Sequence, residues 1–158
     1  MLKKVVTYTD FDDNERIETI YFHMSTADFQ DWLLDFPEIV RNRFLKAASE
    51  SSEEEKQHLL DGVDPSDMIR RIRDLILKSY GQKSEDGRRF VKSAELSNEF
   101  SQTIAYDQIY NEMLDNPDNF TTFVEGIMPK GMAGASEDRI AVPNAKAKPM
   151  RGKATEIK

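Results

Sequence analysis

The stretch Leu77–Pro129, LKSYGQKSEDGRRFVKSAELSNEFSQTIAYDQIYNEMLDNPDNFTTFVEGIMP, decides the fold of this chain. It contains three amphipathic helical patterns and a linker that is punctuated by Gly81 and Gly87. It carries no catalytic motif, and beyond Pro129 the composition changes and the charge reverses sign. A helical body without recognisable chemistry, followed by a loose basic segment, is typical of a binding protein.

Helix signals divide this stretch into elements. Arg88 to Val91 is expected to be extended, and Ser93 is expected to cap a helix with Leu96 and Phe100 inward. A break at residues 101–103 precedes a second helix. Asn116-Pro117 starts the last helix, whose apolar stripe is the clearest in the chain: Phe120, Phe123, Val124, Ile127 and Met128.

The preceding region supplies further helices. Asp64-Pro65 is a strong start signal for a helix that ends near Tyr80, with Gly81 expected as its C-cap. Ser25 is expected to cap an earlier helix, and residues 37–48 form another with Ile39, Phe44 and Leu45 inward. The polar run 49–56 is either a loop or the start of a helix.

Residues 3–22 predict a β-hairpin. Two segments rich in β-branched and aromatic residues, 3–10 and 15–22, flank the turn Asp12-Asp13-Asn14. An isolated two-stranded hairpin is marginal in water, so it has to lean on the helices or pair with another chain. The predicted fold is therefore α+β, mainly α: a folded body of residues 1–129, with the hairpin packed on about five helices, and a flexible, disordered basic tail of residues 130–158.

Charge and composition limit the partners. The chain has 158 residues, no cysteine and a net charge of −7. Residues 1–129 carry 15 basic and 26 acidic side chains, whereas residues 130–158 carry seven basic and three acidic ones. An acidic body repels nucleic acid and anionic membranes, so the expected partners are proteins. The sequence shows no signal peptide and no apolar run long enough for a membrane span.

Catalytic and metal sites are not expected. Asp10 to Tyr21 fails as a calcium loop because position 6 is Glu15 rather than glycine and position 12 is Tyr21 rather than an acid. An acidic hairpin turn is the favoured interpretation. His23 and His58 lie in different elements without a nucleophile or metal-type neighbour. We therefore predict no enzyme activity, no cofactor and no metal.

Three groups of residues are candidates for binding partners. The first is the linker with Tyr80, Arg88 and Arg89, although a solvated linker, balanced by nearby acidic residues, is the favoured explanation of its charges. The second is the last helix, where the stripe becomes a groove only if the other helices leave it uncovered. The third is the basic tail. The candidate residues are Tyr80, Arg88, Arg89, Phe120, Phe123, Ile127, Lys146, Lys148, Arg151 and Lys153.

Several short segments of the sequence, in their order along the chain, resemble those of a known family. The order Lys-Ser-Tyr-Gly, Asp-Gly-Arg-Arg-Phe, Phe-Ser-Gln-Thr and Ile-Met-Pro, together with the opening VVTYTDFDDNERIETIYFHMSTADF, resembles the tail assembly chaperones of long-tailed bacteriophages. The resemblance implies a non-enzymatic protein of the host cytoplasm that is absent from the mature virion. It implies binding to the tape measure protein, recruitment of the major tail tube protein through the tail, and self-association, for which the hairpin edge is the candidate.

Two other functions fit the same sequence. A structural virion component, such as a connector or tail completion protein, would remain in the particle. An acidic inhibitor of a nucleic-acid-binding protein would show contiguous carboxylates and no exposed apolar surface.

Overall fold

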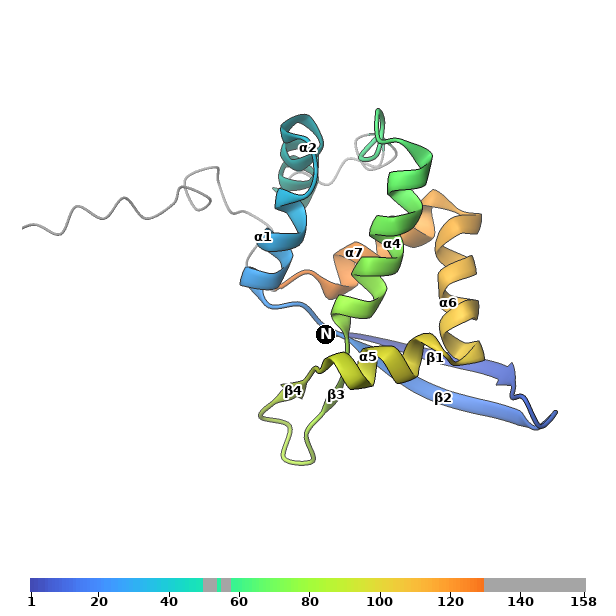
Figure 1. The fold of residues 1–158 in the computed structure, drawn as a ribbon. Coiled ribbons are helices and arrows are strands. Elements are labelled where there is room, and N and C mark those ends of the chain that lie inside the picture. The colour runs from blue at the N-terminus through green and yellow to red at the C-terminus, as the bar shows by residue number, and fades with distance from the viewer. Residues whose placement is uncertain (50–53, 55–57, 130–158) are drawn as a thin grey trace, which may run out of the picture.

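The computed structural model describes residues 1–49, 54 and 58–129. Within these residues, six helices accompany a four-stranded antiparallel sheet of order β1-β2-β3-β4 (Figure 1). The predicted class, α+β and mainly α, is confirmed. The predicted tail lies outside the described residues, as does most of the polar run 49–56.

The hairpin pairs β1 (Leu2–Thr9) with β2 (Glu15–Phe22) along their full length, from Leu2 opposite Phe22 to Thr9 opposite Glu15. Asp10 organises the turn: one carboxylate oxygen accepts hydrogen bonds from the backbone N–H groups of Asp12 and Asn14. The other oxygen accepts from Arg16 Nε at 2.6 Å. The acidic cluster is thus an ordinary hairpin turn, as predicted.

Two short strands extend the sheet. β3 (Tyr80–Lys83) pairs with the end of β2, with Gly81 opposite Tyr21, and β4 (Phe90–Val91) pairs with β3. The prediction that Gly81 is the C-cap of this helix was wrong, because Tyr80 is the C-cap, in an extended conformation, and Gly81 lies in β3. A Cβ atom at position 81 would lie 2.6 Å from the Val91 carbonyl oxygen, so the glycine allows close strand approach.

The predicted helix starts are confirmed by capping hydrogen bonds. Ser25 caps α1 (Thr26–Leu34), Asp64 caps α4 (Pro65–Ser79), and Ser93 caps α5 (Ala94–Ser101). Thr103 caps α6 (Ile104–Asp115), and Asn116 caps α7 (Pro117–Ile127). These side chains satisfy backbone N–H groups that have no partner within the first turn of a helix.

The helix α2 (Glu38–Ser49) corrects one predicted core position. Val40 and Phe44 are buried and Leu45 is half-buried, whereas Ile39 is 62% exposed. Positions 40 and 44 are four residues apart and share one helix face, and Ile39 lies about 100° away from Val40 around the axis. The apolar residues of this short helix do not show from the sequence alone which of its faces is turned to the core.

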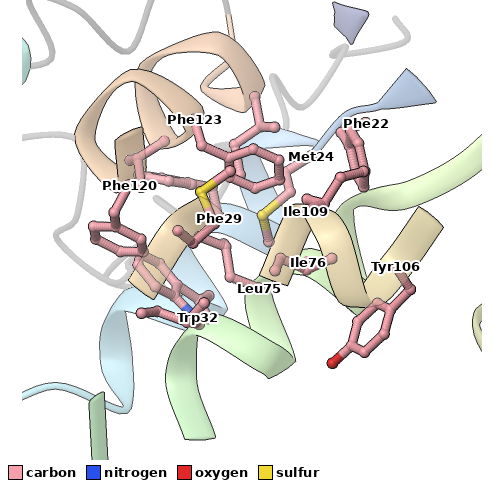
Figure 2. Close-up of a cluster of buried hydrophobic side chains, with 14 of the residues drawn as sticks. Phe22, Met24, Phe29, Trp32, Leu75, Ile76, Tyr106, Ile109, Phe120 and Phe123 are labelled. Carbon is pink, nitrogen blue, oxygen red and sulfur yellow. The ribbon is translucent and has the colours of Figure 1, made fainter. Parts of the chain in front are cut away.

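One aromatic-rich core joins the helices to the sheet. Figure 2 shows Phe120 and Phe123 of α7 facing side chains from α1, α4 and α6. Phe22, at the end of β2, contacts Phe123, Phe100 and Tyr80 in edge-to-face geometry. The hairpin therefore leans on helices of its own chain, and the ion pair between Lys4 and Glu112 of α6, at 2.7 Å, adds a second connection.

Candidate partner-binding surfaces

The apolar stripe of the last helix belongs to the core. Phe120, Phe123 and Ile127 are at most 2% exposed, so the condition for a groove on this face, that other helices leave it uncovered, is not met. α7 is covered by α6 and by β1, where Leu2 lies against Gly126. These three side chains stabilise the fold and are not presented to a partner in this conformation.

Tyr80 is likewise held by packing. Its ring is half-buried and stacks on Phe100, with ring centroids 4.1 Å apart and an interplanar angle of 13°. It also meets the edge of Phe22. The position connects α4 to the sheet, which explains its aromatic character without a partner.

The basic residues of the linker separate into two kinds. Lys78 pairs with Asp74 on α4, and Lys92 pairs with Asp28 on α1 at 2.7 Å. Arg88 and Arg89 are exposed in the loop between β3 and β4, and no carboxylate of the described residues lies within ion-pair distance of either guanidinium. Arg88 and Arg89, together with the exposed Lys83 near the Tyr21 ring, therefore remain available to an acidic partner.

The four candidate residues of the tail, Lys146, Lys148, Arg151 and Lys153, lie outside the described residues. Their role in recruiting a partner stays a prediction.

A shallow hollow of about 380 Å³ lies beside the Lys92–Asp28 pair, between α1, the end of α4 and the start of α5. The Lys92 ammonium donates to Asp28 and, with the Ser25 hydroxyl, holds the pKa of that carboxyl below its usual range. Burial, aided by the positive N-terminus and Lys92, lowers the pKa of His23, which packs edge-on against Phe90. The ion pair between Lys92 and Asp28 ties α1 to the segment after β4.

The hairpin exposes an apolar surface that sequence reasoning did not select. Val5 lies opposite Thr19, and Thr7 lies opposite Ile17, so these four side chains share one face of the sheet, which we call the outer hairpin face. Val5 is 62% and Ile17 71% exposed. Phe11, in the adjoining turn, is 81% exposed. Because successive side chains of a strand point to opposite faces, the sequence places Ile17 on one face of the hairpin and Ile20 and Phe22 on the other. It does not indicate which of the two faces the helices cover.

Among the residues that the structure describes, no group of three or more histidine or acidic side chains is placed to hold a metal ion. Within the same residues, no helix has the length and apolar character needed to cross a membrane.

Comparison with known proteins supplies the family. A family model described as "Phage tail assembly chaperone" matches residues 1–156, which is nearly the whole chain. No curated protein and no solved structure matches the chain. The match covers the hairpin, the helices and the basic segment after Pro129 together. The chain therefore belongs to the phage tail assembly chaperone family.

Proposed function

We propose that this chaperone binds the tape measure protein in the host cytoplasm, keeps it soluble, and recruits tail tube subunits through residues 130–158. It leaves before the tail is complete and is absent from the mature virion. The observation that carries the proposal is the family match over residues 1–156, which includes both the acidic body and the basic segment.

The distribution of charge supports a holding role. A long client with exposed apolar helices aggregates unless those surfaces are shielded. Residues 1–129 carry a net charge of −11, which keeps a complex with such a client soluble by repulsion between complexes. The same charge disfavours nucleic acid as a partner.

The outer hairpin face is the surface that we assign to client contact or self-association. Val5 and Ile17 present apolar area on this face that the described helices leave uncovered, and Phe11 is exposed in the adjoining turn. Isolated apolar side chains are common on protein surfaces, but Val5 and Ile17 are diagonal neighbours on one sheet face, and exposed apolar groups of this kind often bind proteins. β1 is also an edge strand, so its outer backbone groups have no strand partner within the described sheet.

Co-expression tests the proposal. The tape measure protein of the phage that encodes this chain is produced alone, with residues 1–158, or with residues 1–129, and its soluble fraction is measured. We expect residues 1–129 to keep the client soluble, and only residues 1–158 to retain tail tube protein in a pull-down. A client that precipitates equally with and without the chaperone overturns the holding role. Equal recovery of tube protein by both forms overturns the recruiting role of the tail.

Two matched variants localise the contact. Ile17→Lys places a charge on the outer hairpin face, whereas Ile39→Lys places one at a similarly exposed apolar position on α2. We expect the first to reduce client solubility and the second to leave it unchanged. The reverse result would move the client site away from the hairpin.

A further inference from the structure

The described chain ends beside the start of the hairpin. Gly126 of α7 lies so close to Leu2 of β1 that a Cβ atom at position 126 would be 2.8 Å from Cδ1 of Leu2. Pro129, the last described residue, follows three positions later. Residues 130–158 therefore continue from a point near the first residues of β1, where the outer hairpin face also begins.

Opposite charges flank the outer hairpin face along its strands. Lys3 lies on this side of β1, two residues before Val5, and is exposed. Glu15 is exposed at the other end, and the turn, which projects beyond the helices (Figure 1), adds the exposed Asp12 and Asp13. None of these four charged side chains has an ion-pair partner among the described residues. The face thus changes from a basic end, across apolar side chains, to an acidic end.

The tail carries the same three kinds of side chain in the complementary order. Asp138 comes first, Ile140 and Val142 follow, and Lys146 and Lys148 come last. An extended segment that runs from the basic end of the face toward the turn places each charge near its opposite and the two aliphatic side chains over the apolar centre. The tail starts at the basic end, so its own chain direction is the required one.

The spacing of the two orders also agrees. Positions 138, 140 and 142 point to one side of an extended segment, as positions 3, 5 and 7 do on β1. With Ile140 beside Val5, Asp138 therefore lies at the level of Lys3. Lys146 follows Ile140 by six residues, a span of up to about 20 Å, which brings it to the acidic turn. Residues 130–139 span up to about 33 Å when extended, which is enough to pass around β1 from α7 to its outer face.

Charge and tethering favour this occupant in this direction. Reversing the segment would set Lys146 beside Lys3 and Asp138 beside Glu15, so like charges would meet at both ends. A segment joined to the body by a short linker is present at an effective concentration in the millimolar range, on the order of 1 mM. A weak contact is therefore enough to hold the chain's own tail, whereas a second copy has to bind from bulk solution.

We propose that residues 138–148 dock along β1 on the outer hairpin face of their own chain. Ile140 and Val142 cover Val5 and Ile17, and Lys146 and Lys148 meet the acidic turn. A client or a second copy then has to displace the tail, and capture of the tail by another protein uncovers the face. The docking concerns this chain alone, whereas its regulatory consequence rests on the proposed function.

Disulfide trapping in the full chain tests the docking. The chain has no cysteine, so two introduced cysteines form the only intramolecular disulfide. Thr19→Cys places a thiol on the outer hairpin face, opposite Val5, and Ala141→Cys places one in the tail. With oxidised glutathione at nanomolar protein concentration, we expect this disulfide to form at least about tenfold faster than in the matched pair Ile39→Cys and Ala141→Cys, because docking raises the local thiol concentration. Non-reducing electrophoresis and mass spectrometry measure both rates.

Charge reversals test the register within the same cysteine pair. Lys146→Glu combined with Lys148→Glu is expected to slow trapping at least about threefold, as loss of two exposed ion pairs does. Lys153→Glu combined with Lys158→Glu makes the same change of net charge farther along the tail and is expected to stay within about twofold. Asp12→Lys with Glu15→Lys is expected to restore trapping of the chain that carries Lys146→Glu and Lys148→Glu. If Thr19→Cys does not fold, Thr7→Cys on the same face takes its place.

Equal trapping rates for the Thr19 and Ile39 pairs overturn the proposal, as does a rate that Lys146→Glu with Lys148→Glu leaves unchanged. Disulfide-linked dimers whose yield rises with protein concentration, without faster intramolecular trapping, assign the face to a second copy instead. The experiment contains no client, so its outcome is separate from co-expression. If the tail is trapped as expected but the client is not kept soluble, the docking stands and the proposed function is wrong.

Discussion

Gly81 passes so close to Val91 that a Cβ atom at position 81 would lie 2.6 Å from the Val91 carbonyl oxygen and equally close to the Phe90 ring. The backbone oxygen belongs to the β3–β4 pairing and has little freedom to move. We expect Gly81→Ala to lower the free energy of unfolding by about 2–3 kcal/mol, as overpacked positions do. Urea denaturation measures the difference, and an unchanged transition midpoint contradicts it.

Gly126 provides a matched comparison on α7. A Cβ atom there would lie 2.8 Å from Cδ1 of Leu2, which is the end of a flexible side chain near the N-terminus. Alanine is favoured over glycine in a helix by about 1 kcal/mol, which offsets the displacement of Leu2. We expect Gly126→Ala to change stability by less than about 1 kcal/mol in the same urea experiment. A loss as large as that of Gly81→Ala would show that Leu2 cannot move.

Phe123 distinguishes a core residue from a partner-binding residue. Its ring is 2% exposed and lies 5.1 Å from the Phe22 ring, centroid to centroid. We expect Phe123→Ala to destabilise the free chain by about 3–5 kcal/mol, since it leaves a cavity between α7 and the sheet. Thermal unfolding monitored by circular dichroism checks this. A variant with unchanged melting that has lost client binding would restore the groove interpretation.

Part of the pH dependence of stability follows from His23. Its folded-state pKa lies below the ordinary value of 6.5, so the unfolded chain takes up the proton first as the pH falls. We expect the free energy of unfolding to decrease as the pH drops below about 6.5 and to level off once the folded protein is also protonated. Asp28 acts in a lower window: its lowered pKa contributes stability above about 3.8 that is lost on further acidification.

Urea titrations at several pH values measure both effects. His23→Gln removes the titrating group while retaining a polar side chain, and we expect it to flatten the profile between pH 5 and 7. Lys92→Met removes the partner of Asp28 and is expected to weaken the dependence below pH 4. A His23→Gln profile that matches the original chain over pH 5–7 argues against this origin.

If chains associate through the hairpin, the average molecular mass of the protein in solution increases with its concentration. We expect the full chain to sediment as an oligomer at micromolar concentration and Ile17→Lys to shift it toward the monomer, since a charge on the outer hairpin face is costly to bury. Analytical ultracentrifugation of both proteins provides the measurement. An oligomer that survives Ile17→Lys unchanged places the contact elsewhere.

The local signals in the sequence predicted the helices and the hairpin well. Asp64 before Pro65 and Asn116 before Pro117 mark helix starts by chemistry that needs no tertiary context, and both caps are present. Phe100, which was expected to face inward on the helix after Ser93, is likewise buried in the core. These features depend on neighbouring residues, which the sequence contains.

Features that depend on distant residues were less predictable. The role of Gly81 is set by Val91, ten positions away, and only the paired strands show it. The exposed state of Ile39 and Ile17, and the burial of Phe120, depend on which faces other elements cover. The candidate partner surfaces therefore changed more than the fold did.

The central claim is that the chain acts on other proteins during tail assembly and then departs. Quantitative mass spectrometry of assembly intermediates and of purified particles, from the phage that encodes this chain, tests it most directly. We predict that the chain accompanies the tape measure protein in the intermediates and is absent from finished particles. A fixed number of copies in every purified particle would contradict the account and identify a structural virion component instead.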